Sequence, residues 1–167
     1  MKETIMFTID SSTKKTGICI WENAQYQDHI LINYDPDDNK NDDYSTMDKR
    51  FPAMCHDILD ILDIYRPSII YIEDEVVTRN MNTCRFLFRL QGVIEGWAMK
   101  HDCEFNTVRP TQWRAACGIL QGKKKRNELK ALAIAYVKEH FNLDVTDDVA
   151  DAICIGVYAK RLFGIEG

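Results

Sequence analysis

The segment Phe7-Thr-Ile-Asp-Ser-Ser-Thr-Lys-Lys-Thr-Gly-Ile-Cys-Ile-Trp21 places an apolar, β-branched run on each side of a short polar turn. Such a pattern predicts a β-hairpin, the first strand of which ends in Asp10. Aspartate is disfavoured in strands, so its position at the end of a buried one needs a reason. Asp10 could simply cap the turn, as strand-end aspartates commonly do, or it could belong to a functional site. The hairpin alone leaves both interpretations open, and the positions of the other acidic residues must distinguish a turn cap from a functional site.

Length and composition indicate one globular domain over residues 1–167, because 46% of the residues are hydrophobic and 28% are charged. No apolar run is long enough for a membrane span and the start lacks a signal-peptide pattern, so we expect no membrane partner. The six cysteines form no C-x-x-C pair and lie mostly in apolar stretches. We therefore expect reduced core thiols in a cytoplasmic protein.

The net charge of −5 is distributed unevenly along the chain. Residues 35–48 contain six Asp and one Lys, whereas residues 77–147 contain twelve Lys and Arg against seven Asp and Glu. Such asymmetry is common without any function, but it also fits a binder of acidic polymers whose acidic loop points away from the ligand. The acidic part, residues 35–43, is polar and broken by a proline, so we expect an exposed loop there, prone to disorder.

Hydrophobic periodicity predicts the remaining elements. Three strands, expected at residues 4–9, 16–22 and 26–33, form an antiparallel meander. Further along the chain we expect, in order, a helix at 45–65, a fully apolar strand at 68–72, a helix at 80–101, a strand at 103–108, a helical turn from 110, and helices at 127–140 and 146–162. This order predicts an α/β fold with a mixed five-stranded sheet, three antiparallel strands plus two parallel ones, flanked by helices.

This arrangement predicts that several acidic side chains come together at one edge of the sheet. Asp10 and Glu73 end two strands that a right-handed crossover makes parallel, so their side chains should meet. Asp148 and Asp151 lie three residues apart on one face of the last helix. A response to the helix dipole explains Asp148 well but Asp151 less well. Glu75 is a competing acid, but its place beyond the strand end makes solvation the simpler interpretation.

A cluster of three or four carboxylates within a few Å repels itself unless cations neutralise it or some acids keep their protons. Oxygen ligands select hard cations, so we expect Mg²⁺, with Mn²⁺ able to substitute. Two such ions per site would activate a water and stabilise the leaving oxygen of a phosphodiester.

Three motifs occur in register along the chain: Ile9-Asp10-x-x-Thr13-x-x-Thr16-Gly17, Ile72-Glu73 and Asp148-Val-Ala-Asp151-Ala152. Together they resemble the RuvC family of Holliday-junction resolvases, within the RNase H-like superfamily, and most of all its short bacteriophage members. The resemblance implies an RNase H-like fold, a homodimer and Mg²⁺-dependent symmetric cutting of four-way junctions and other branched DNA such as forks. It carries Asp10, Glu73, Asp148 and Asp151 over as the catalytic, metal-binding acids. It also implies a role in DNA recombination, repair or phage DNA debranching, in the cytoplasm of a bacterial host, without a nucleotide cofactor.

The chain departs from the cellular family at three places. Ser11-Ser12 stands where Pro-Gly is usual after the first Asp, and Val76-Val77-Thr78 stands where cellular members often carry an aromatic residue that engages unpaired bases. Stacking on bases is therefore in doubt. The acidic loop 35–43 resembles an insertion.

Basic side chains supply candidate DNA contacts, because neutralised phosphates release counterions. The candidates are Arg79, Arg85, Arg89, Lys123, Lys124, Lys125 and Arg126. A solvated surface turn is the alternative for Lys123–Arg126. Trp97 and Trp113 fit core positions better than stacking platforms. For the dimer interface we consider the helix at 80–101, where Phe86, Phe88 and Leu90 point to more than one side, although burial within the monomer would also explain them.

Two other functions remain compatible with these residues. An RNase H-type nuclease acting on RNA–DNA hybrids would use the same acids, and dimerisation with junction preference would separate the two. A junction-binding protein with a degenerate site is disfavoured because all four acids are present. An actin-like or sugar-kinase fold also begins with an Asp-ended hairpin, but it needs a second domain and glycine-rich phosphate loops, for which this chain has no room.

Overall fold

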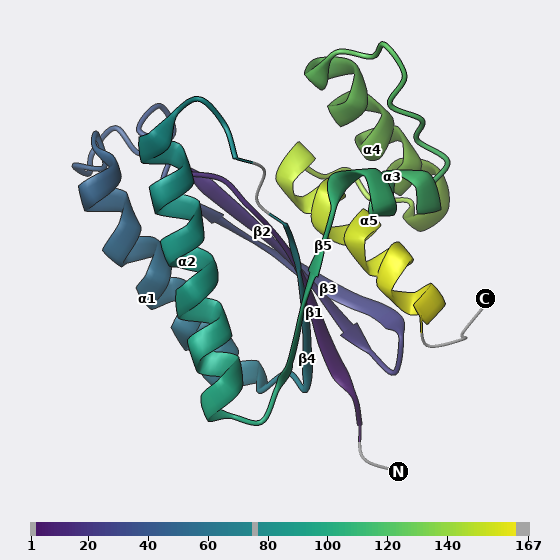
Figure 1. The fold of residues 1–167 in the computed structure, drawn as a ribbon, viewed down its shortest axis with the longest axis horizontal. Coiled ribbons are helices and arrows are strands. Elements are labelled where there is room, and N and C mark those ends of the chain that lie inside the picture. The colour runs from purple at the N-terminus through teal and green to yellow at the C-terminus, as the bar shows by residue number, and fades with distance from the viewer. Residues whose placement is uncertain (1–2, 75–76, 163–167) are drawn as a thin grey trace.

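A five-stranded sheet forms the centre of the computed structural model, which describes residues 3–74 and 77–162 (Figure 1). Its strands are β1 (Ile5–Ser11), β2 (Lys15–Glu22), β3 (Gln25–Asn33), β4 (Ile69–Glu73) and β5 (Glu104–Val108), arranged in the order β3-β2-β1-β4-β5. β1 pairs antiparallel with β2, and β2 pairs antiparallel with β3. β4 lies parallel to both β1 and β5. The predicted α/β fold with a mixed sheet is thereby confirmed.

Helices cover both faces of this sheet (Figure 1). α1 (Met47–Tyr65) and α2 (Met81–Lys100) pack on one face, and α3 (Pro110–Ala116), α4 (Arg126–Phe141) and α5 (Asp147–Leu162) lie on the other. Each face has its own apolar core. Strands covered on both sides need apolar residues at every position, which explains the unbroken run of β4.

The alternation of side chains along the strands decides which residues face α5. In β1, Met6 packs in the core of the α5 face, whereas Phe7 and Ile9 pack against α1 and α2. The hydroxyl of Thr8 donates a hydrogen bond to the backbone oxygen of Ala152 in α5 at 2.6 Å. By the same parity, Asp10 at the end of β1 belongs to the α5 face.

A glycine allows α5 to approach the sheet closely. Gly17 pairs with Asp10 across the β1–β2 hairpin. A Cβ atom at Gly17 would overlap the backbone of Asp148 and Val149 at the beginning of α5. Only the absence of a side chain at this position lets the first turn of α5 rest directly on the strand pair that carries Asp10.

The sequence placed most element ends within one or two residues. The helical turn expected from Pro110 is a full seven-residue helix, α3. The acidic loop contains a hydrogen-bonded turn, in which the backbone amides of Asp38 and Asn39 donate to the carbonyl of Asp35 at 3.1 and 3.0 Å. All six cysteines are buried and unpaired in the described part of the chain, as expected. Among the described helices, none combines the length and apolar character that a membrane span requires.

Candidate active site

The four predicted acids line one cavity of about 420 Å³ at the carboxyl ends of β1 and β4. Asp10 comes from β1, Glu73 from the last position of β4, and Asp148 and Asp151 from the first turns of α5. Asp74, whose parity turns it to the opposite face, is not among the lining residues. Glu75 and Val76 lie outside the described residues. The expectation that these acids meet at one edge of the sheet is therefore met.

Glu73 is held by a tryptophan that also belongs to the core. The indole Nε1 of Trp113 donates a hydrogen bond of 2.6 Å to Glu73 Oε2. Trp113 is 1% exposed, so its ring has little freedom to turn away. Burial raises the pKa of Glu73, whereas the Trp113 hydrogen bond and the charges of Arg114 and Arg126 lower it. Trp113 thus occupies the core position expected for it and in addition fixes the orientation of an acid.

Asp151 is the most perturbed carboxylate of the cavity. Burial, followed by the negative charge of Glu73, raises the pKa of Asp151 to about 8. Its Oδ1 atom is buried and accepts no hydrogen bond from any described residue. A buried carboxylate oxygen without a donor is costly unless a proton or a cation reaches it.

The neighbouring acids complete this negative environment. Burial, followed by the charge of Asp147, raises the pKa of Asp148. For Asp147 itself burial acts in the same upward direction, but its ion pair with Lys130 prevails and the pKa is lowered. Asp147 is thus neutralised by the protein, whereas Asp148 and Asp151 are not.

This donor set fits a divalent cation. Carboxylate oxygens are the ligands that Mg²⁺ and Mn²⁺ prefer, and the unpartnered oxygen of Asp151 is the kind of atom that a cation would satisfy. Within residues 3–74 and 77–162, however, no three ligating side chains are already gathered tightly enough to hold an ion. The acids share the cavity without forming a finished coordination shell.

Three basic side chains line the same cavity: Arg114, Arg126 and Lys130. The sequence singled out Arg126 as part of a basic loop, but it missed Arg114 and Lys130. Arg114 lies 5.0 Å above the ring of Trp113, and its buried Nε donates to no described residue. A signal for Arg114 did exist, because α3 directly follows β5, whose carboxyl end lies at the same sheet edge as those of β1 and β4.

The other predicted DNA contacts are exposed, but they do not converge on the cavity. Lys123, Lys124 and Lys125 precede α4, and Lys124 Nζ donates to the backbone oxygen of Leu120 at 2.8 Å. Arg79, Arg85 and Arg89 lie at or near the beginning of α2. Arg89 stacks on Phe51, 4.0 Å from the ring centre. In Figure 1, α2, α4 and α5 begin at the same end of the sheet, and the beginning of α5 lies between those of α2 and α4.

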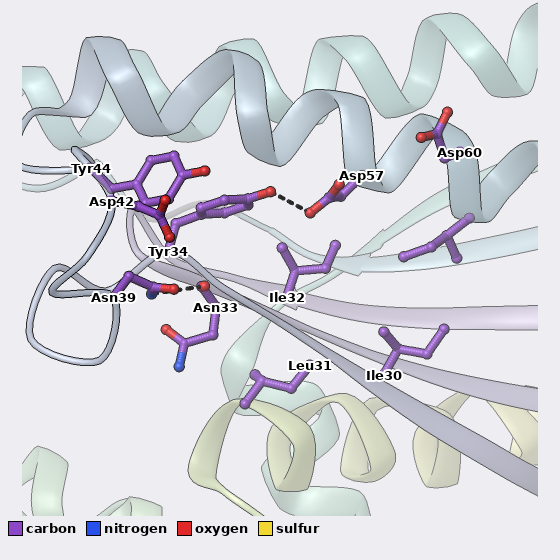
Figure 2. Close-up of a pocket in the computed structure, with 11 residues that line it drawn as sticks. Ile30, Leu31, Ile32, Asn33, Tyr34, Asn39, Asp42, Tyr44, Asp57 and Asp60 are labelled. Atoms are coloured by element: carbon purple, nitrogen blue, oxygen red, sulfur yellow. Dashed lines mark hydrogen bonds between the residues drawn. The ribbon is translucent and has the colours of Figure 1, made fainter.

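A second pocket lies between β3 and α1 and contains none of the predicted site residues (Figure 2). Tyr34, Tyr44 and Asp57 line it, and the hydroxyl of Tyr34 donates a hydrogen bond of 2.5 Å to Asp57. This bond satisfies the acid within the protein, so Asp57 lacks the unpartnered oxygen that marks Asp151. We therefore place the candidate active site at the carboxyl ends of β1 and β4.

Known proteins resemble the chain in sequence. Residues 6–158 match the family model described as crossover junction endodeoxyribonuclease RuvC. RuvC proteins of Dictyoglomus turgidum and Dictyoglomus thermophilum are each 24% identical to the chain over 115 residues, which cover 68% of this chain and 72% of the relative.

Solved structures share the fold. Thermus thermophilus RuvC in complex with a Holliday junction superimposes with a TM-score of 0.67 at 15% identity, covering 95% of this chain and 96% of that one. Fowlpox virus resolvase, bound to Holliday junction DNA, gives 0.59 at 12% identity and covers 96% and 99% of the two chains. The yeast mitochondrial Holliday junction resolvase gives 0.60 at 13% identity and covers 95% and 78%.

Proposed function

The chain belongs to the RuvC family of crossover junction endodeoxyribonucleases, and on this premise we propose that it resolves four-way DNA junctions by hydrolysing phosphodiester bonds at Asp10, Glu73, Asp148 and Asp151. One observation supports the site above all. Four acids from three separate elements line one cavity, and a buried oxygen of Asp151 accepts no hydrogen bond from the described residues. A buried carboxylate with a purely structural role would normally accept hydrogen bonds from the protein.

Divalent cations, Mg²⁺ with Mn²⁺ as a substitute, are the proposed cofactor, held as two ions by these four carboxylates. When bound, they supply an activated water and charge stabilisation for the leaving oxygen. The chain itself orients the ligands. Trp113 fixes Glu73, and the close approach of α5 at Gly17 fixes the distance between Asp148 and the strand of Asp10.

The cavity also offers positive charge for the substrate. Arg114 and Arg126 lower the pKa of Glu73, so their charges act inside the site. Guanidinium groups match the oxygens of a phosphodiester in a forked geometry. We propose that these two arginines bind the scissile phosphate, while the exposed groups at the beginnings of α2 and α4 bind flanking phosphates.

A homodimer is part of the proposal, because symmetric cutting of a four-way junction needs two equivalent sites. Of the three α2 residues considered for the interface, Phe86 and Leu90 are buried in the core, whereas Phe88 is 46% exposed. Met81 and Met99 are exposed apolar residues of the same helix. At helical spacing these three side chains share one face, which is the proposed interface.

The decisive experiment measures cleavage of an end-labelled four-way junction, a replication fork, an RNA–DNA hybrid and a linear duplex, with and without Mg²⁺. We expect symmetric, Mg²⁺-dependent nicks near the junction for the wild type. Asp10→Asn should abolish cutting and preserve junction binding, because it removes charge with little change in shape. Asp74→Asn is the matched control, since it removes a neighbouring acid that does not line the cavity and should cut normally.

Each other outcome has a definite meaning. Fork cutting beside junction cutting would extend the proposal to a broader debranching nuclease, such as phage DNA processing requires. Cutting confined to the RNA strand of the hybrid would instead favour the RNase H-type alternative. Binding without cutting by the wild type would contradict the proposed hydrolysis and favour a junction-binding protein.

A further inference from the structure

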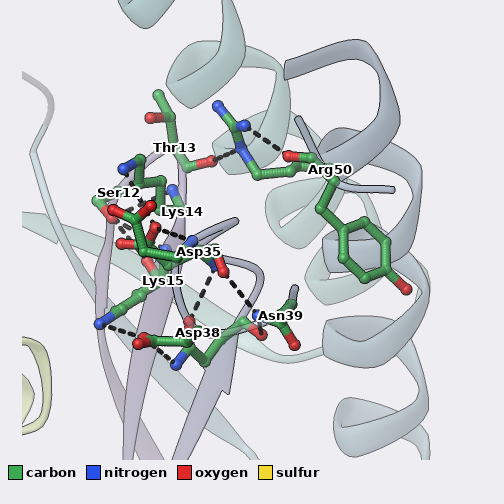
Figure 3. A network of polar contacts seen from close by, with 11 residues as sticks. Ser12, Thr13, Lys14, Lys15, Asp35, Asp38, Asn39 and Arg50 are labelled. Carbon is green, nitrogen blue, oxygen red and sulfur yellow. Dashed lines mark hydrogen bonds and ion pairs between the residues drawn. The ribbon is translucent and has the colours of Figure 1, made fainter. Parts of the chain in front are cut away.

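The acidic loop 35–43 is docked on the β1–β2 turn by two ion pairs (Figure 3). Lys14 Nζ lies 3.2 Å from Asp35 Oδ1, and Lys15 Nζ lies 3.1 Å from Asp38 Oδ2. This contact brings the loop to the end of the sheet that carries the cavity of the acids, because the same turn carries Ser12 and Thr13, which line that cavity.

Hydrogen bonds fix the loop in this position. The side-chain amide of Asn39 (Nδ2) donates to the backbone oxygens of Asn33 and Asp35 at 3.1 and 2.9 Å. Arg50, which is 5% exposed, joins the two segments, since its Nε donates to the carbonyl of Thr13 and its Nη1 to the carbonyl of Tyr44, both at 2.8 Å (Figure 3). The ion pairs are thus part of a contact between loop and turn that several hydrogen bonds also hold.

Lys15 is the first residue of β2, two positions before Gly17, and alternation along the strand places both residues on the face that α5 covers. Its positive charge lowers the pKa of both Asp147 and Asp148, so its field reaches the first turn of α5. The same ammonium group is paired with Asp38 of the loop. The neighbouring Lys14, whose side chain is 45% exposed, follows Ser12 and Thr13 in the turn that forms this rim of the cavity. Two ammonium groups at the rim of a phosphodiesterase cavity are well placed to meet the DNA backbone.

We propose that Lys14 and Lys15 are contacts for DNA phosphates and that Asp35 and Asp38 occupy them in the free protein as phosphate mimics. This inference rests on the proposed function, since it takes branched DNA as the ligand. Carboxylate and phosphate compete for the same ammonium group. Exposed ion pairs are weak, so a correctly placed phosphate can displace them. The loop consequently lowers affinity for DNA that reaches this rim, because each phosphate must first displace a carboxylate.

The test measures the salt dependence of junction binding without divalent ions, by fluorescence anisotropy of a labelled four-way junction. Asp35→Asn/Asp38→Asn keeps the shape of the loop but frees both lysines. We expect tighter binding and a salt slope steeper by about 1.8, because each phosphate contact releases about 0.9 cation. In the wild type this release is offset, since each displaced carboxylate takes up a cation from solution, whereas the variant has no carboxylate to displace. The variant should then lose about tenfold more affinity than the wild type between roughly 50 and 200 mM salt.

Two further variants separate this effect from net charge and from misfolding. Asp37→Asn/Asp42→Asn changes the charge of the same loop equally, but neither carboxylate is ion-paired to a described residue, so the slope should stay at the wild-type value. Asp38→Asn alone leaves Asp35 intact and should steepen the slope by about half as much. Adding Lys14→Gln/Lys15→Gln to Asp35→Asn/Asp38→Asn should return it to that of the wild type.

Equal slopes for both double Asn variants, in a wild type that binds the junction, would overturn this inference and leave the proposed function standing. Weaker binding by Asp35→Asn/Asp38→Asn would also overturn it, because the loop would then only support the turn. Failure of the wild type to bind the junction at any salt concentration would overturn the proposed function and this inference together.

Discussion

At the scale of single residues, the acids of the cavity differ in how the fold holds them. Glu73 receives a hydrogen bond from a rigid indole, whereas Asp151 is buried with an oxygen that no described residue satisfies. The first arrangement fixes geometry and the second stores electrostatic repulsion. Both are expected of a site that completes itself only on binding a cation, and each leads to a separate prediction.

Trp113→Phe removes the donor to Glu73 but keeps an aromatic ring in the core. A hydrogen bond to a charged group contributes about 1.5–3 kcal/mol, so we expect cleavage to slow by about ten- to a hundredfold. The half-saturating Mg²⁺ concentration should also rise, because Glu73 loses its fixed orientation. A Mg²⁺ titration of the cleavage rate on a four-way junction measures both quantities.

Trp97→Phe is the matched control for this substitution. Trp97 is also buried and donates to a carboxylate, that of Asp63, at 2.9 Å, but it lies on the opposite face of the sheet. Its loss should lower the melting temperature and leave the Mg²⁺ titration unchanged. Equal effects of both substitutions on the titration would mean that Trp113 contributes only to packing.

Asp151→Asn tests whether the buried, negatively charged carboxylate of Asp151 destabilises the fold, because its charge depends on pH. The pKa of Asp151 is higher in the folded chain, at about 8, than its ordinary value of 3.8, so the folded state binds more protons than the unfolded one. Folding then loses stability as pH rises between about 4 and 8. Without divalent ions, Asp151→Asn should therefore melt at a higher temperature than the wild type at pH 8, and the difference should shrink towards pH 5.

Thermal unfolding in a chelator at several pH values measures this difference. Added Mg²⁺ at pH 8 should raise the melting temperature of the wild type more than that of Asp151→Asn. Asp37→Asn, which removes an exposed acid, is the control and should follow the wild type at every pH. A melting difference that does not vary with pH would contradict the assignment of the raised pKa to Asp151.

At the scale of elements, local pattern was enough to predict strands, helices and the four acids. Parity along β1 and β4 and helical spacing in α5 are properties of adjacent residues, and these bring Asp10, Glu73, Asp148 and Asp151 to one face. The predictable part of the site is therefore the part carried by regular secondary structure.

Contacts between distant, irregular segments could not be predicted in this way. The acidic loop resembled a disordered insertion because its partner cations lie on another element, with 21 positions separating Lys14 from Asp35. Arg50 was hidden within the first helix, although its side chain binds the turn 37 positions earlier. Arg114 was missed for a related reason: the order of elements places α3 at this edge of the sheet, but it does not show which side chain of so short a helix faces the cavity.

At the scale of the whole molecule, the charged groups of the proposed site lie at one end of the sheet and a row of exposed apolar side chains lies along α2. The cavity of the acids lies at one end of the sheet. Exposed basic residues lie at the beginning of α2 and just before α4, and both helices begin at that end (Figure 1). The exposed apolar face of α2 runs from Met81 to Met99, beginning at that same end. A dimer formed through α2 would therefore hold two basic-flanked cavities in a fixed relation, as paired cuts across a junction require.

Phe88→Glu tests this arrangement, because it places a charge at the centre of the proposed interface. We expect the wild type to be a dimer by light scattering and the variant to be a monomer at the same concentration. Burying an unpaired carboxylate against a second copy of the helix would cost several kcal/mol, enough to dissociate an interface of moderate affinity. Cleavage of a cruciform plasmid should then change from paired cuts to single nicks.

Ile64→Glu is the matched control, since Ile64 is also an exposed apolar residue, at 75% against 46% for Phe88, but lies on α1 rather than α2. The same charge at this position should leave both the dimer and the paired cuts intact. A dimer that survives Phe88→Glu but not Ile64→Glu would move the interface to α1. A monomeric wild type that still makes paired cuts would show that the junction itself brings the two copies together, and the exposed face of α2 would then act only on DNA.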